Sequence, residues 1–369
     1  MLSLLSDRDR NLWVSTELSL FRMRENRIAE EVVHGVGSRA RRLFEDRDGS
    51  LWIATQSTGV HRVWNGVGTL APLHVPPAMA HFMWAVVPWG DGVMTGGTYG
   101  LATARDGRME PVPGSEQLPM VYGMALDGDG ILLGSTRGVF RYHADGRIES
   151  PAELAPLHDI RTNAFLRDRE GRLWLGTRRG LYRPDPGAPL RRLLGTDNSA
   201  RHEIRTVVQT RDGRLFAGGA GGLYELVGDR LVQVPLPESP LLVMAIHETT
   251  DGRLLVGSGS SGRLYLQHEG RWVDLGRSRG IPPNDVYAII PDGSGRLLVT
   301  GVRGAYLVPE QELVDAAADP ARVVSVRGLL TQGRQFLAGQ QLNCCLGGGS
   351  GRGLYQGGRF VLPIAGGVF

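Results

Sequence analysis

Two acidic turns contain residues whose types and spacing could bind a metal ion. The segments DRDG at 46–49 and DGDG at 127–130 each place two carboxylates within four residues. A calcium loop needs six or more oxygen ligands, typically from a longer acidic run that ends in a distant glutamate. Asp and Gly also favour tight turns for backbone reasons of their own. We therefore interpret these segments as structural turns and predict no metal site.

The same acidic turns could belong to a glycosidase, which needs one acid and one base or nucleophile in a common cleft. A catalytic pair should interrupt a repeating pattern, whereas these acidic residues recur from copy to copy. Trp13, Trp52 and Trp174 could stack on sugar rings, but each occupies the same place in its copy, which is typical of packing residues. We predict no catalytic residues.

Histidine and cysteine give no sign of a metal, cofactor or nucleophile site. The nine histidines show no paired ligand spacing, and no phosphate-binding glycine loop or nucleophile elbow is present. Cys344 and Cys345 are neighbours, so they cannot bridge distant strands, and their role stays open. We expect no cofactor. The histidines are His34, His61, His74, His81, His143, His158, His202, His247 and His268.

A repeat of about forty residues forms the scaffold that must position any functional side chains of this chain. Its clearest copies lie at 45–63 (EDRDGSLWIATQSTGVHRV) and 167–184 (RDREGRLWLGTRRGLYRP). Aligned on one bulky residue, the first eight copies follow one another at intervals of 38 to 43 residues, and an insertion near 316–339 lengthens the last interval. The aligned residues are Trp13, Trp52, Met94, Leu132, Trp174, Phe216, Leu255, Leu298 and Val361.

Each copy reads as short strands separated by glycine turns. An apolar run such as 163–166 precedes a polar turn, and strands at 173–175 and 181–183 follow. The first strand is apolar on both faces, as expected of a strand enclosed between neighbouring sheets. We predict an all-β fold, a β-propeller of four-stranded antiparallel blades, with one helical turn near 311–318.

Composition argues against a nucleic-acid partner and against a membrane-spanning helix. The 369 residues include 41 basic ones, all arginine, and carry a formal net charge of +3. These arginines are scattered rather than clustered, which argues against nucleic acid. No run of apolar residues is long enough for a membrane helix, and the N-terminal MLSLLSDRDR becomes charged too early for a signal peptide.

Two columns of the repeat vary while the scaffold stays constant, as expected where turns carry function on a rigid frame. One lies eleven residues before the aligned residue, near the start of the innermost strand, and includes Met83 and Val121. The other lies four or five residues after it; free drift of exposed turn residues would also explain such variation. The ligand-binding candidates from the two columns are Arg41, Asn163, Arg205, Tyr287, Gln56, Tyr99, Arg137, Arg178 and Arg303. Their arginines suggest an anionic group such as a carboxylate.

The pattern D-x-x-G-x-L-W-φ-G-T-x-x-G-L-Y resembles the two-component regulator propeller repeat, and 167–183 is a nearly complete instance. The segment from Asn343 to the end resembles the closing repeat of such propellers in the diguanylate-cyclase branch. The resemblance implies a seven-bladed sensor propeller, often one of two in tandem, outside the cytoplasmic membrane. It also implies a hybrid histidine kinase or diguanylate cyclase, an unknown small-molecule or glycan ligand, and pairing of two sensor portions as a homodimer.

These observations predict a non-catalytic ligand-binding or protein-contact sensor in bacterial signal transduction; a propeller lyase or glycosidase is the alternative. We expect residues 1–75 to be two repeats from the tail of an upstream propeller and 76–369 to form a propeller whose last blade is cut. A competing count places the copies from Trp52 to Leu298 in one ring. Either way we expect a fragment that lacks its output domain.

Overall fold

A computed structural model describes most of the chain. The backbone is described for residues 3–6, 12–15, 19–24, 27–34, 40–45, 50–55, 60–64, 71–72, 83–98, 100–105, 108–193, 203–238, 241–259, 261–281, 285–301, 304–331, 354–356, 359–361, 363–364 and 367–368. Side chains are described for 12–14, 23, 84–98, 100–103, 110–193, 203–238, 241–259, 261–276, 278–281, 285–301 and 306–326.

The chain divides into two compact units, one of residues 1–68 with 327–329 and one of the remaining residues. The smaller unit holds a sheet of four strands in sequence order and a second sheet of three. The four strands are β1 (Ser3–Ser6), β2 (Leu12–Ser15), β3 (Ser19–Arg24) and β4 (Arg27–His34). The three are β5 (Ala40–Glu45), β6 (Ser50–Thr55) and β7 (Val60–Trp64).

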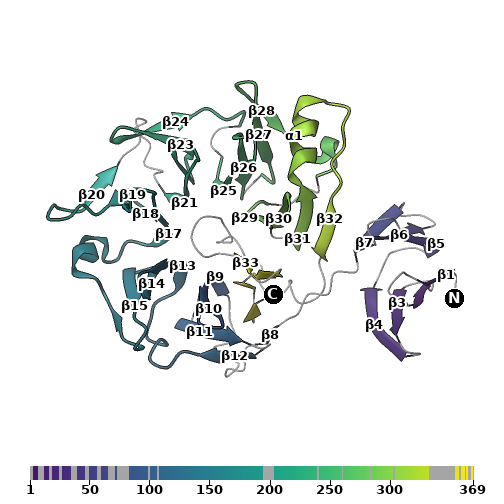
Figure 1. The fold of residues 1–369 in the computed structure, drawn as a ribbon, viewed down its shortest axis with the longest axis horizontal. Helices are drawn as coiled ribbons and strands as arrows, with labels where there is room; N and C mark the ends of the chain where they lie inside the picture. Colours follow the sequence, from purple (N-terminus) through teal and green to yellow (C-terminus); the bar gives the residue numbers. More distant parts are fainter. Residues whose placement is uncertain are drawn as a thin grey trace. The chain divides into compact units, whose positions relative to one another are not determined.

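The described residues between 83 and 331 form six complete four-stranded antiparallel blades, whereas the resemblance to regulator propellers implies a ring of seven (Figure 1). The first blade consists of β9 (Met83–Trp89), β10 (Gly92–Gly97), β11 (Gly100–Arg105) and β12 (Arg108–Pro111). The second consists of β13 (Val121–Asp127), β14 (Gly130–Ser135), β15 (Gly138–Tyr142) and β16 (Ile148–Glu149). The third consists of β17 (Thr162–Arg167), β18 (Leu173–Thr177), β19 (Gly180–Arg183) and β20 (Arg191–Leu193).

The other three blades repeat the same order of strands. They are β21 (Ile204–Gln209), β22 (Leu215–Gly219), β23 (Gly222–Val227) and β24 (Arg230–Val234); β25 (Val243–Glu248), β26 (Leu254–Ser258), β27 (Leu264–His268) and β28 (Arg271–Asp274); and β29 (Ala288–Pro291), β30 (Arg296–Gly301), β31 (Gly304–Pro309) and β32 (Arg327–Thr331).

The first strand of each blade lies innermost, and these six strands lie side by side in chain order from β9 to β29 (Figure 1). Short strands near the end of the chain occupy the sector between the sixth and first blades, with β33 next to β29 and β35 next to β9. Strand β36 pairs with β8, a joining of distant segments that the repeat pattern does not predict. These strands are β8 (Ala71–Pro72), β33 (Leu354–Gln356), β34 (Arg359–Val361), β35 (Pro363–Ile364) and β36 (Gly367–Val368).

Apolar packing between blades forms the core. Trp174 of β18 is fully buried and packs with Ile204, Val207 and Tyr224 of the following blade, as the sequence predicts for this tryptophan. Trp13 of the smaller unit is also buried, and the side chain of Trp52 lies outside the described residues. Burying a large aromatic side chain in this way is among the strongest contributions to a β-sheet core.

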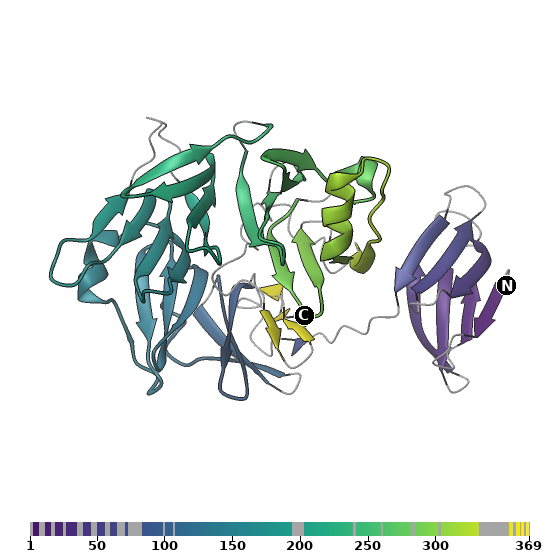
Figure 2. The same ribbon diagram turned by 45° about the horizontal axis from the view of Figure 1, so that its top comes forward.

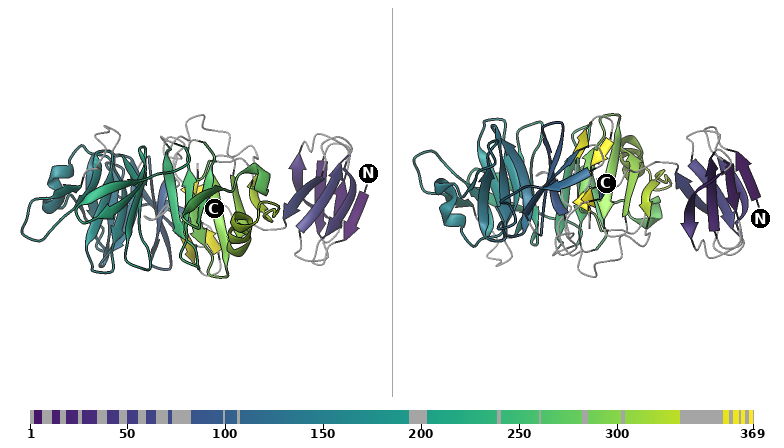
Figure 3. Two further views of the ribbon diagram at one scale, coloured as in Figure 1. Left: turned by 90° about the horizontal axis from the view of Figure 1, so that it is seen from above. Right: turned by 90° about the horizontal axis from the view of Figure 1, so that it is seen from below.

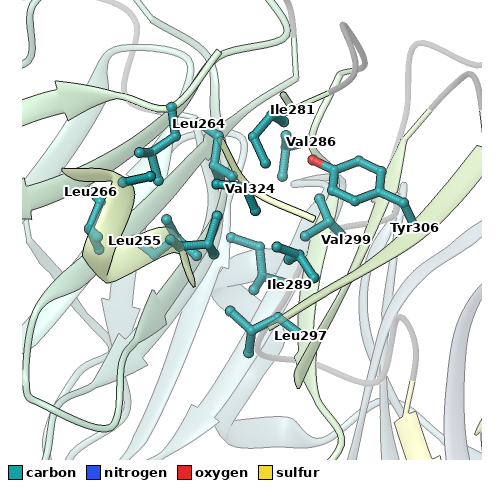
Figure 4. Close-up of a cluster of buried hydrophobic side chains, with 14 of the residues drawn as sticks. Leu255, Leu264, Leu266, Ile281, Val286, Ile289, Leu297, Val299, Tyr306 and Val324 are labelled. Carbon is teal, nitrogen blue, oxygen red and sulfur yellow. The ribbon is translucent and has the colours of Figure 1, made fainter. Parts of the chain in front are cut away.

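The helical turn predicted near 311–318 is the nine-residue helix α1 (Glu310–Ala318), which continues directly from β31 (Figure 2). Its Leu313 and Ala316 belong to an apolar cluster that also contains Leu255, Val299 and Tyr306 (Figure 4). The other described helices are short 3-10 segments, Ala152–Leu157 and Arg277–Arg279. No helix in the described ranges is long and apolar enough to cross a bilayer.

The strands of each blade in the larger unit run between two faces (Figure 3). We call the upper face the one that carries the starts of the innermost strands and the turns between second and third strands. Backbone bonds from Arg178 to Arg161 and from Ala220 to Glu203 join these two sets of residues. The lower face carries the turns between first and second strands, at 168–172, 210–214, 249–253 and 292–295.

Candidate ligand-binding site

A β-bulge at the start of the innermost strands defines the candidate site. In β17 the pairing passes from Thr162 with Thr177 to Ala164 with Gly176, so Asn163 is the extra residue of the bulge. Arg205 in β21 and Met244 in β25 occupy the same position. A bulge leaves its extra residue outside the ladder and redirects its side chain, so one variable side chain per blade is set apart at the upper face.

Met83 and Val121 begin the innermost strands β9 and β13, as the aligned column predicts, but the bulge in each strand falls on the next residue. The bulge residues of β9 and β13 are Trp84 and Tyr122, not Met83 and Val121. The hairpin that follows β13 is a two-residue turn between the paired residues Asp127 and Gly130, which is shorter than the turn at 168–172. A shorter turn reduces the spacing between the bulge and the aligned residue, so a fixed offset selects the wrong residue.

Trp84 and Tyr122 begin a contiguous row of side chains along the upper face. Their rings stack with centroids 4.9 Å apart and an interplanar angle of 7°. The guanidinium carbon of Arg161 lies 5.1 Å from the centroid of the Tyr122 ring, within the range of a cation–π interaction. Trp84 and Tyr122 are both mostly buried, so the aromatic pair is a fixed wall rather than a mobile flap.

The row continues as an ionic cluster around one carboxylate. Glu203 accepts hydrogen bonds from Arg161 and from the amide of Asn163, at 3.4 Å in the second case. Its Oε1 atom also lies 2.9 Å from Nε of Arg205. Two guanidinium groups thus gather around one carboxylate. The side chains of Arg161 and Glu203 each keep 18% exposure, so solvent or a ligand can reach the charged groups.

The structure therefore brings two of the nine predicted residues together, Asn163 and Arg205, and places the others elsewhere or leaves them undescribed. Tyr287 is buried just before β29, where its hydroxyl donates to Asp285 at 3.3 Å. Arg137 is exposed and pairs with Asp159, and Arg178 is exposed in the turn after β18. Arg41 lies in β5 of the smaller unit with an undescribed side chain; Gln56, Tyr99 and Arg303 lie outside the described residues.

Sequence reasoning missed Arg161 and Glu203, which hold the cluster together. Both lie two residues before a bulge residue, in the loop that enters the innermost strand. Neither residue belongs to the columns that the repeat alignment singles out. A signal was available, because this position also changes from copy to copy, as Arg161, Glu203 and Asp285 show.

The acidic turns on the lower face use their carboxylates for internal hydrogen bonds. Asp168 accepts bonds from the backbone and side chain of Arg172 and from the indole of Trp174, at 2.7 to 2.8 Å. Burial disfavours its charged form, yet these donors together hold the pKa of Asp168 below its usual value. Within the described residues, no three His, Cys, Asp or Glu side chains form a group that could hold a metal ion.

Comparisons with known proteins agree with this architecture. The two-component regulator propeller model matches residues 35–57 and 156–179. The extracellular domain of a proposed hybrid two-component system from B. thetaiotaomicron is similar over the whole chain, with a TM-score of 0.61 and 17% identity. This chain spans 50% of the length of that structure. No curated protein sequence matches the chain.

Virginiamycin B lyase from Staphylococcus aureus, in a catalytically inactive form with quinupristin, has a TM-score of 0.55 and 9% identity. The match covers 79% of this chain and 95% of the lyase. A second structure of that lyase covers 69% of this chain at a TM-score of 0.52 and 11% identity. At such identities the likeness concerns the fold alone. This chain is a β-propeller of four-stranded blades whose segments 35–57 and 156–179 are two-component regulator propeller repeats.

Proposed function

We propose that the larger unit is a non-catalytic sensor propeller that binds a small molecule or glycan at its upper face. The observation that carries the proposal is the row Trp84–Tyr122–Arg161–Glu203–Arg205, which spans the innermost strands of four consecutive blades. An aromatic wall beside two guanidinium groups favours a ligand that has both an apolar face and an anionic group.

The proposed setting is a bacterial signal-transduction protein, with the propeller outside the cytoplasmic membrane. The match to regulator propeller repeats and the similarity to an extracellular domain of a two-component system support this setting. In such an arrangement the ligand biases contacts between sensor portions, and a homodimer is the simplest assembly that passes the signal to an output domain.

We also propose that the ring has seven blades. Strands β33 to β36 lie in the sector between the sixth and first blades, and β8 adds an earlier segment of the chain to this group. The repeats at Trp13 and Trp52 would then belong to a neighbouring propeller. Closing the ring in this way would protect the edges of its blades, which otherwise expose unpaired backbone groups.

The alternative function, a propeller lyase or glycosidase, finds less support in the site. Of the four histidines with described side chains, His158 is exposed and pairs with Asp159 at 3.1 Å, and the other three lie near the lower face. These three are His143, His247 and His268, which contact Glu149, Glu310 and Arg253 respectively. They therefore do not converge with the polar row at the upper face. A propeller lyase that depends on a metal would need a basic histidine near that metal.

A ligand screen by thermal shift tests the sensor proposal. Libraries of neutral and acidic saccharides and small carboxylates are added to the purified chain, and hits are measured by calorimetry. Arg161→Ala should weaken binding of an anionic hit by about tenfold or more, because a charge-assisted hydrogen bond contributes about 1.5–3 kcal/mol.

The matched control is Arg192→Ala, which removes an exposed arginine of the same blade that bonds only a backbone carbonyl in the described structure. This control should bind the hit as the parent does. If Arg192→Ala and Arg161→Ala weaken binding equally, general surface charge explains the binding and the proposed site is wrong.

A further inference from the structure

Arginines on the lower face connect consecutive blades in a repeated way. The side chain of Arg169 donates to the carbonyl oxygen of Arg211 in the next blade at 2.6 Å. Arg211 in turn donates to the carbonyl oxygens of Thr249 and Thr250 in the blade after that. We call this contact the arginine latch; it joins the second residue of one turn to the turn of the following blade.

A side-chain acceptor accompanies each latch. The backbone N–H of Arg169 donates to Gln209 at 2.9 Å, and that of Arg211 donates to Glu248 at 2.8 Å. Both acceptors are the last residue of the innermost strand in the following blade. Each of these two boundaries therefore receives one guanidinium and one backbone N–H from the preceding turn.

The next boundary, between the blades that begin with β25 and β29, differs from these two in both respects. Thr250 occupies the latch position and is too short to reach the next turn, and Pro291 ends β29 without a side-chain acceptor. Glu310, the first residue of α1, supplies the missing acceptor and receives the N–H of Thr250 at 2.6 Å. The acceptor is thus replaced, whereas the guanidinium is not.

A pocket of about 290 Å³ lies at this boundary. Its lining includes Thr250, Gly293, Glu310 and His247 together with Arg211 and Arg296. A cavity with about 10–15 Å³ of such space already holds one water molecule, so this pocket has room for a small ligand.

One carboxylate of the pocket, that of Glu310, is not paired with an arginine in the described residues. Arg211 pairs with Glu248 at 3.3 Å, and Arg296 pairs with Asp292 at 2.7 Å. Glu310 faces His247 at 2.9 Å, and hydrogen bonds to its carboxylate hold its pKa below the usual value although burial opposes ionisation. Of the two carboxylates in the lining, Glu248 is paired with Arg211, and Glu310 faces His247 instead of an arginine.

We propose that this pocket binds a small molecule through a guanidinium group, which takes the place of the absent latch arginine. The ligand donates to the Glu310 carboxylate and to the carbonyl groups of residues 292 and 293, which correspond to the two carbonyls that Arg211 engages. Planar guanidinium groups match such paired acceptors better than ammonium groups do. This site is separate from the proposed upper-face site and does not depend on it.

Calorimetric titration with agmatine tests the proposal, with putrescine as the matched probe that has an ammonium group in place of the guanidinium. Agmatine should bind at millimolar or lower concentration and putrescine about tenfold more weakly. Thr250→Arg should abolish agmatine binding and raise the thermal midpoint, because the introduced side chain restores the latch. Thr250→Ser, which leaves the pocket open, should bind as the parent does.

Glu310→Gln gives an independent variant that keeps an acceptor for Thr250. Its affinity for agmatine should fall about tenfold, which corresponds to about 1.4 kcal/mol. Absence of agmatine binding to the parent chain, equal binding of the two probes, or unchanged binding by folded Thr250→Arg would each overturn the proposal. Arg161→Ala should leave agmatine affinity unchanged, so failure of the upper-face site is distinguishable from failure of this one.

Discussion

The indole N–H of Trp174 donates a 2.7 Å hydrogen bond to the carboxylate of Asp168, six residues earlier in the chain. The ring is buried between two blades, and the carboxylate belongs to the turn that leads into the same strand. This hydrogen bond thus joins the acidic turn of the repeat to its buried second strand. This contact explains why an acidic turn and a tryptophan occur together in this copy.

Replacing Trp174 tests this role of the tryptophan. Trp174→Ala should lower the free energy of unfolding by about 3–5 kcal/mol, because it opens a large cavity between blades. Trp174→Phe keeps much of the packing but removes the donor to Asp168, so it should cost about 1–3 kcal/mol. Urea unfolding monitored by circular dichroism measures both changes. A loss below about 1 kcal/mol for the alanine variant would contradict the assignment to the core.

Stability should decrease in acid because of the lower-face turns. Burial opposes ionisation of Asp168 and Asp292, but hydrogen bonds from neighbouring donors lower the pKa of both carboxyls in the folded state. A lowered folded pKa stabilises the fold above the ordinary carboxyl pKa, and this stabilisation is lost as pH falls through the folded pKa.

The measurement is urea unfolding of the parent and of Asp292→Asn at several pH values between 7 and 3. The variant should lose stability at pH 7 and show a smaller further loss on acidification. Parallel pH profiles for the two proteins would show that Asp292 does not contribute. The exposed pair formed by Asp145 and Arg147 offers a control in Asp145→Asn, which should leave the profile almost unchanged.

Tyr306→Phe should stabilise the larger unit. Tyr306 is buried in the cluster beside α1, and its hydroxyl has no hydrogen-bond partner within the described part of the chain (Figure 4). Burial raises its pKa, so the group is neutral at ordinary pH. Removing an unsatisfied buried hydroxyl should raise the free energy of unfolding by about 1 kcal/mol. A clear loss of stability on chemical denaturation would mean that the hydroxyl has a partner.

Gly219→Ala should disturb the upper-face cluster directly. A Cβ atom at this position would lie 1.7 Å from the carbonyl oxygen of Glu203, a distance that the backbone cannot accommodate without moving. We expect a loss of at least about 1 kcal/mol, together with weaker binding of any ligand of the upper face. The neighbouring Ala220→Gly keeps the hydrogen bond to Glu203 and should cost less. Equal behaviour of the two variants would contradict the close approach.

Purified protein should show no lyase or glycosidase turnover. The polar row at the upper face contains one carboxylate, Glu203, engaged by two arginines, whereas glycoside hydrolysis needs two carboxyl groups across the scissile bond. Assays with a streptogramin and with chromogenic glycosides test this expectation. Turnover that a single His→Ala change abolishes would favour the enzyme alternative.

Sequence by itself determined the repeat, the four-stranded blades and the burial of Trp174. These features are local, because strand alternation, glycine turns and a bulky residue at a fixed place recur every forty residues or so. The helix near 311–318 was also readable, since Glu310–Ala318 interrupts the strand pattern. Local propensity and periodicity are sufficient for such elements.

Tertiary structure alone decided which side chains meet. Glu203 gathers Arg161, Asn163 and Arg205 because the innermost strands of successive blades lie side by side, about forty residues apart in sequence. The identity of the bulge residues Trp84 and Tyr122 depends on turn length, which a fixed offset ignores. Likewise, Glu310 replaces a missing acceptor only because α1 begins beside the turn of another blade, and no pattern within one repeat encodes contacts between repeats.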